Sequence, residues 1–140
     1  MSVTFHELEK VKLHSRKTLK NFLANIFLQE GRTLETLGIV FCSDEYLINI
    51  NKQHLKHDYY TDIITFDLSE TKSSPIVAEL YISAERVKEN SSTNKVSFTN
   101  EIHRVIFHGV LHLCGFGDKS KTDIAVMRSK ENEYLNKYGL

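Results

Sequence analysis

A long apolar segment, residues 98–114, restricts the possible folds more than any other part of the chain. Charged or imidazole side chains interrupt it at Glu101, His103, Arg104, His108 and His112. A helix that is apolar around most of its circumference is normally buried in a core. The segment therefore predicts a central buried helix around which the other elements pack.

Hydrophobic periodicity predicts further helices on both sides of this segment. Apolar residues three and four positions apart share one face of a helix. The expected helices cover residues 13–30, 45 to about 54, 84–89 and 122–138. The last of these is expected to turn Ile124, Met127 and Leu135 toward the core.

Short runs rich in β-branched residues predict strands at 37–42, 63–68 and 76–82. The last two are expected to form a hairpin across a polar loop at 69–75, and a second loop is expected at 90–97. Helices and strands are mixed without strict alternation. The sequence therefore favours one α+β domain over residues 1–140, with a small mixed sheet packed on the central helix.

The overall charge gives no general attraction for polyanions, because 18 Lys and Arg residues balance 18 Asp and Glu residues. RNA contact would need a local patch, and the densest positive stretch is Lys10, Lys12, His14, Arg16, Lys17 and Lys20. A solvated face of the first helix is the simpler interpretation of that stretch. We expect no membrane contact and a cytoplasmic location, with Cys42 and Cys114 reduced.

His108 and His112 are four residues apart, so they lie one turn apart on the same helical face. Two imidazoles at this spacing are a familiar way to hold one metal ion. Asp118, just past a turn with two glycines, is the candidate third ligand, and two histidines with one carboxylate match a catalytic zinc site. The alternatives are two core histidines and an Asp118 that serves a turn or caps the last helix.

Gly109 separates this pattern from that of the zinc peptidases, which carry a glutamate base directly after the first histidine. A metallopeptidase is therefore disfavoured. Glycine inside a helix costs about 1 kcal/mol relative to alanine, so Gly109 indicates close approach of a ligand or tight packing. Cys114 is rotated about 200° from His112 around the helix, so we expect it in the core.

The run from His108 to Asp118, HGVLHLCGFGD, closely resembles the signature HGxLHLxGYDH of the YbeY family of bacterial rRNA-maturation endoribonucleases. Gly117 stands where the family commonly has Asp, and Asp118 stands where it has a third metal-binding histidine. Asn51 with residues 57–66 resembles the family segment N-x6-D-x-PTDVLSF, and residues 78–83 resemble the strand GDIxIS.

This resemblance implies a zincin-like fold with one Zn²⁺ per chain, held by His108, His112 and, by substitution, Asp118. It also implies single-strand-specific cleavage of RNA in maturation of the 16S rRNA 3′ end and in ribosome quality control. The implied partners are single-stranded RNA, rRNA and the small ribosomal subunit. An aspartate ligand can relax the metal preference toward other divalent ions such as manganese or magnesium.

Substrate contacts are expected from the second resembling segment, at Lys56, Asp58, Thr61 and Asp62. Leu55 replaces an arginine that the family uses to handle phosphate, which leaves Lys56 as the neighbouring cation. The proton-transfer candidates are His57, Asp58, Asp62 and Glu79, because Gly109 cannot act as a base. The missing arginine keeps open an alternative function, a ribosome-assembly factor that binds RNA or protein and holds a structural metal.

Overall fold

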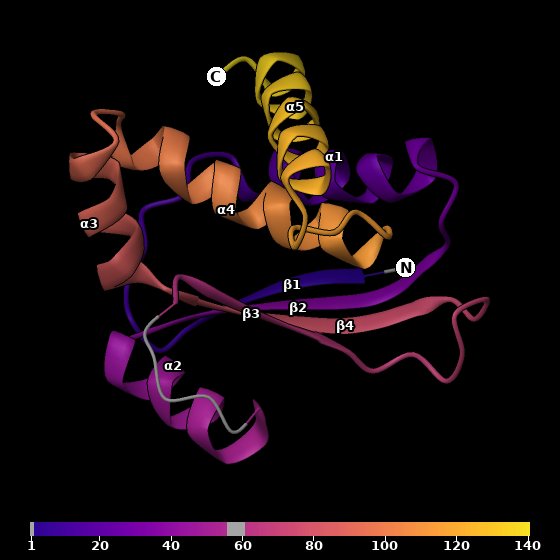
Figure 1. Ribbon diagram of the computed structural model, residues 1–140, viewed down its shortest axis with the longest axis horizontal. Helices are drawn as coiled ribbons and strands as arrows, with labels where there is room; N and C mark the ends of the chain where they lie inside the picture. The colour runs from indigo at the N-terminus through magenta and orange to yellow at the C-terminus, as the bar shows by residue number, and fades with distance from the viewer. Residues whose placement is uncertain (1, 56–60) are drawn as a thin grey trace.

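A computed structural model describes residues 2–55 and 61–140 of the chain. Within these residues, five helices, one π-helical turn and four strands follow one another along the chain (Figure 1). They are β1 (Ser2–Glu7), α1 (Arg16–Gln29), β2 (Leu34–Cys42), α2 (Asp44–Ile50), η1 (Asn51–Leu55), β3 (Ile63–Asp67), β4 (Ile76–Ser83), α3 (Ala84–Thr93), α4 (Phe98–Leu113) and α5 (Lys121–Tyr138).

The four strands form one mixed sheet in the order β1-β2-β4-β3. The strands β1, β2 and β4 are parallel, and β3 runs antiparallel to β4 at the edge. The predicted hairpin is therefore confirmed, with Ile63 opposite Ile82 and Asp67 opposite Ala78. Strand β1 was not predicted, although Val3 and Phe5 alternate with polar residues as in a half-buried edge strand.

The helices α1, α4 and α5 lie over one face of the sheet, and α2 lies under the other face (Figure 1). Helix α4 is central: it contacts α1, α3, α5, β3 and β4. Ile106, Phe107, Val110 and Leu111 on this helix are fully buried. The prediction of a central buried helix within an α+β fold is confirmed, and its bounds differ from the expected ones by one residue.

Several expected boundaries are wrong. The residues at 90–93 continue α3 instead of forming a loop, because Ser91 is buried and its hydroxyl donates to the Lys88 carbonyl at 2.7 Å. The helix expected from 45 to 54 divides into α2 and η1, after a cap in which the Ser43 hydroxyl accepts from the Tyr46 backbone N–H. Helix α1 begins only at Arg16, so the positive residues before it do not lie on a helix face.

The orientation of α5 also differs from the prediction at one position. Ile124 is 51% exposed instead of pointing to the core. The buried residues of α5 are Met127, Glu131, Tyr134 and Leu135. No helix in the described parts of the chain combines the length and the apolar character needed to cross a membrane.

Gly109 is explained by packing of α4 on the sheet. A Cβ atom at this position would lie 2.8 Å from Ile63 Cδ1 and 2.9 Å from Leu80 Cδ1. These distances are too short for real contacts, so a larger side chain would lift the helix from β3 and β4. Of the two interpretations of this glycine, the structure supports tight packing.

We therefore expect Gly109→Val to lower the free energy of unfolding by about 2–3 kcal/mol, because overpacking a well-filled core forces side chains and backbone to shift. Urea unfolding followed by circular dichroism measures this change. The control is Ala125→Val on α5, an exposed helical position where the same residue is tolerated. Equal stability of the two variants would contradict the packing argument.

Candidate functional site

His108 and His112 lie in the last two turns of α4 and form one wall of a cleft of about 540 Å³. Their rings are nearly parallel, at an interplanar angle of 4° and a centroid separation of 6.5 Å. His108 is half-buried, whereas His112 is exposed. Residues from η1, from the start of β3 and from the loop after α4 line the rest of the cleft, among them Asn51, Thr61, Asp62, Asp118 and Lys119.

The Nδ1 atom of each histidine is held by a hydrogen bond. His108 Nδ1 donates to Glu131 Oε2 at 2.7 Å, and His112 Nδ1 donates to the Phe116 carbonyl at 3.0 Å. A neutral imidazole with its proton on Nδ1 carries its free electron pair on Nε2. In both side chains, Nε2 is therefore the nitrogen atom that can coordinate a metal ion.

Asp118 lies on the loop between α4 and α5, with its Oδ2 atom 3.6 Å from His108 Nε2. It does not cap α5, since Ser120 is the N-cap and its hydroxyl accepts from the Asp123 N–H. The structure thus brings Asp118 to one of the two histidines. In residues 2–55 and 61–140, however, no three His, Cys, Asp or Glu side chains form a closed ligand set.

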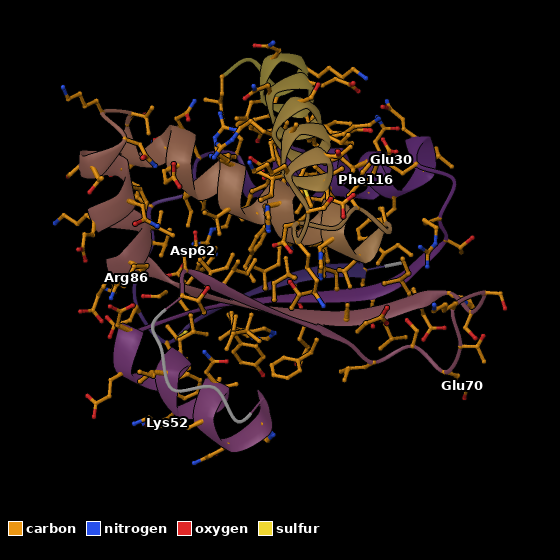
Figure 2. All side chains as sticks on the ribbon, in the orientation of Figure 1. Glu30, Lys52, Asp62, Glu70, Arg86 and Phe116 are labelled. Carbon is orange, nitrogen blue, oxygen red and sulfur yellow. The ribbon has the colours of Figure 1, made fainter. Side chains whose placement is uncertain are left out.

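The loop that carries Asp118 is fixed at its beginning. Gly115 has a φ of 107°, and this left-handed conformation ends α4. The Phe116 ring packs against the core beside α5 (Figure 2). The Lys130 ammonium lies 5.4 Å from the centroid of this ring. This packing holds the Phe116 carbonyl where His112 donates to it.

Glu131 on α5 is a site residue that the sequence analysis missed. Its side chain is 6% exposed, and besides His108 it accepts a hydrogen bond from Arg104 Nη1 at 3.0 Å. Burial alone raises the pKa of Glu131, but the hydrogen bonds from His108 and Arg104 outweigh burial and lower it. One signal was available: Glu131 lies midway between Met127 and Leu135, on the apolar stripe of α5.

The same contacts act on His108. Burial lowers the pKa of this histidine, whereas the hydrogen bond to Glu131 and the nearby carboxylates raise it above its ordinary value overall. The protonation of the two side chains is therefore coupled through one hydrogen bond.

Asp62 lines the cleft and also an adjoining cavity of about 200 Å³ that reaches Glu131. Burial raises the pKa of Asp62, and the neighbouring His108 opposes this shift. Thr61, a predicted substrate contact, lies in the same cleft, where its hydroxyl donates to the Ile63 carbonyl at 3.4 Å. A carboxyl group with a raised pKa in a cleft is suited to general acid or base chemistry.

Glu79, another proton-transfer candidate, lies on the opposite face of the sheet in a separate pocket, and the Tyr81 hydroxyl donates to it at 3.3 Å. It is therefore not brought to the histidines. The candidates Lys56, His57 and Asp58 fall outside the described residues, as does the side chain of Leu55. Asp62 is thus the proton-transfer candidate that the described part of the chain places in the cleft.

Comparisons with known proteins agree with the sequence resemblance. A family profile described as "Endoribonuclease YbeY" matches residues 3–139. A protein of that name from Cytophaga hutchinsonii is 42% identical over 132 residues, covering 94% of this chain and 92% of the relative. Another from Flavobacterium psychrophilum is 46% identical over 115 residues, covering 82% of this chain and 81% of the relative.

A solved structure has a similar fold. The solution structure of TM1509 from Thermotoga maritima superimposes with a TM-score of 0.63 at 24% sequence identity, covering 96% of this chain and 87% of the other. The profile match spans nearly the whole chain, and the relatives exceed 40% identity over most of it. The chain therefore belongs to the YbeY endoribonuclease family.

Proposed function

We propose that this chain is a single-strand-specific, metal-dependent endoribonuclease of rRNA maturation and ribosome quality control, and that His108, His112 and Asp118 hold its Zn²⁺ in a zincin-like site. The observation that carries the proposal is the orientation of the two histidines. Each has its Nδ1 fixed by an acceptor, so each offers Nε2 to the cleft. Zinc-binding histidines are typically held in this way by a carboxylate or carbonyl group.

The donor set also fits zinc chemically. Ligand atoms around a tetrahedral zinc with bonds of about 2.0–2.2 Å lie roughly 3.3–3.6 Å apart. The separation of 3.6 Å between His108 Nε2 and Asp118 Oδ2 agrees with that geometry. Since the Asp118 side chain is 47% exposed, its carboxylate can turn toward His112 without repacking the core.

The bound metal would supply a water that ionises near neutral pH and would polarise a phosphoryl oxygen of the RNA. Asp62 accepts or returns the proton in this proposal, because it lies in the cleft with a raised pKa. Thr61 and Lys119 line the same cleft, and in this proposal they contact the RNA backbone. Lys119 provides a positive charge near the site, in addition to the predicted Lys56. The small ribosomal subunit and the cytoplasm are the proposed partner and location.

Metal content of the purified protein tests the ligand set. We expect about one zinc per wild-type chain by mass spectrometry, and a sharp loss in Asp118→Ala because one of three donors is removed. Asp118→His should retain zinc, because an imidazole replaces the carboxylate as donor. A wild-type protein without metal after zinc is added back, or an Asp118→Ala protein with full zinc, would contradict this ligand set.

Chelation tests the reaction itself. Removing the metal should abolish cleavage of single-stranded RNA, and adding zinc should restore it. An unstructured protein substrate should remain intact under both conditions, because Gly109 replaces the base of the zinc peptidases.

A further inference from the structure

The face of the sheet opposite α4 carries the pocket that Glu79 lines, of about 320 Å³. Ring side chains gather there between the sheet and the helices α2 and η1 (Figure 2). Four of them define what we call the aromatic pocket: Tyr46, His54, Phe66 and Tyr81. Tyr46 is 44% exposed, and Leu68 at the same pocket is 55% exposed. Solvent-accessible apolar surface in one hollow is typical of a binding site.

The four rings form a continuous series of contacts. Tyr46 and Tyr81 are stacked with centroids 6.4 Å apart, and Phe66 meets Tyr81 edge-on at 5.7 Å. His54 meets Phe66 edge-on at 6.2 Å. Such contacts fix the orientation of the rings, so the exposed ring surface of Tyr46 is preorganised for a further planar group.

The aromatic pocket and the cleft share the same two structural elements. Strand β3 contributes Ile63 and Thr65 to the cleft and Phe66 to the aromatic pocket. The turn η1 begins with Asn51 at the cleft and includes His54 at the aromatic pocket. Because β3 is the edge strand of the described sheet, the cleft and the aromatic pocket lie on the two sides of one sheet edge.

The negative charge in the aromatic pocket favours the base of a nucleotide over its phosphate. Glu79 is the acidic residue that lines it, and its carboxylate is a hydrogen-bond acceptor that repels phosphate. An exocyclic amino group of a base is a donor and complements this carboxylate. Unpaired bases stack on aromatic side chains, and such stacking is a main source of affinity for single strands.

We propose that the aromatic pocket is a subsite for one unpaired, amino-bearing base of the RNA whose backbone lies in the cleft. This inference rests on the proposed function, since it assigns a second part of the same substrate. The proposed subsite would distinguish single-stranded from duplex RNA, because a base that is paired and stacked in a duplex cannot enter the aromatic pocket.

Tyr46→Leu tests the proposal, with Tyr46→Phe as the matched control. Leucine keeps an apolar side chain but removes the ring, whereas phenylalanine keeps the ring and removes the hydroxyl. The Ser43 cap uses only the Tyr46 backbone N–H, so both variants keep it. The probe is a short single-stranded oligoribonucleotide containing 2-aminopurine, whose fluorescence is quenched by stacking, in a buffer with a chelator that prevents cleavage.

We expect Tyr46→Leu to bind this oligonucleotide roughly tenfold more weakly than wild type and to lose the quenching, while Tyr46→Phe retains both. Removing the bases from the oligonucleotide should weaken wild-type binding but hardly affect Tyr46→Leu. If the wild type cleaves RNA with zinc while Tyr46→Leu binds and quenches normally, the base subsite is wrong and the nuclease function stands. If the wild type neither binds nor cleaves single-stranded RNA, both proposals are wrong.

Discussion

His112→Ala should lower cleavage of single-stranded RNA by about a thousandfold or more, because the proposed site loses one of its two imidazole ligands and with it the metal that would activate the attacking water. The fold should be unaffected. His112 is exposed, and alanine is the residue that best favours a helix. Initial rates on a fluorescent single-stranded RNA, with zinc in excess, measure the effect.

His6→Ala is a suitable control, since this exposed histidine lies on β1 away from the cleft. It should cleave RNA at the wild-type rate. Cleavage by His112→Ala at more than a tenth of that rate would contradict the metal site. If neither the wild type nor His112→Ala cleaves RNA while both bind the ribosome, the assembly-factor interpretation would be favoured instead.

Glu131→Ala should lower the free energy of unfolding, and this is the second largest effect that we expect. The variant removes the acceptor of two buried or half-buried hydrogen-bond donors, His108 and Arg104. Breaking a buried ion pair by removing one partner typically costs about 3–5 kcal/mol. We expect the free energy of unfolding to fall by about 3 kcal/mol, at the lower end of this range. The reason is that the Arg104 side chain is 19% exposed and can form hydrogen bonds to water instead. Urea unfolding of zinc-free protein measures this change.

Zinc affinity should fall in the same variant by about 10–100-fold, because His108 loses the group that fixes its tautomer and ring orientation. Glu131→Gln should be intermediate, since its amide oxygen still accepts from His108 Nδ1 but lacks the charge. Glu133→Ala on the same helix removes only an exposed pair with Lys137 and should change neither quantity measurably. Wild-type zinc affinity in Glu131→Ala would show that Glu131 is purely structural.

The parts of the fold that the sequence predicted well are those with long or repeated apolar patterns. Helix α4 was predicted to within one residue because its apolar run exceeds any strand length. The region at 90–97 was predicted as a loop from its Ser, Thr and Asn content, and residues 94–97 do connect α3 to α4. Residues 90–93 instead continue α3, where burial of Ser91 overrides the weak helix propensity of these residues. Strand β1 contains only two apolar residues, Val3 and Phe5, which is too few for its alternation to be distinctive.

The candidate site likewise contains residues that the sequence predicts and residues that it does not. The spacing of His108 and His112 is local, so the sequence alone predicts that they share one helical face. The contact between Glu131 and His108 joins residues 23 positions apart on two helices, and no local pattern specifies which side chains of α4 and α5 meet. Asp62 and Glu79 were equivalent candidates in the sequence, and the fold separates them: Asp62, just before β3, lines the cleft, whereas Glu79 on β4 lines the pocket on the other face of the sheet.

The exposed loop position of Asp118 has a consequence for how such a site evolves. The two histidines are built into the helical layer, where Glu131 and the Phe116 carbonyl constrain them. Asp118 projects from outside that layer, and its replacement requires no compensating change in the core. Since the codons for histidine and aspartate differ by a single nucleotide, one point mutation at this position exchanges a nitrogen for an oxygen in the ligand set that we propose. If Asp118 is a ligand as proposed, such an exchange changes the metal preference of the site while the hydrophobic core stays unchanged.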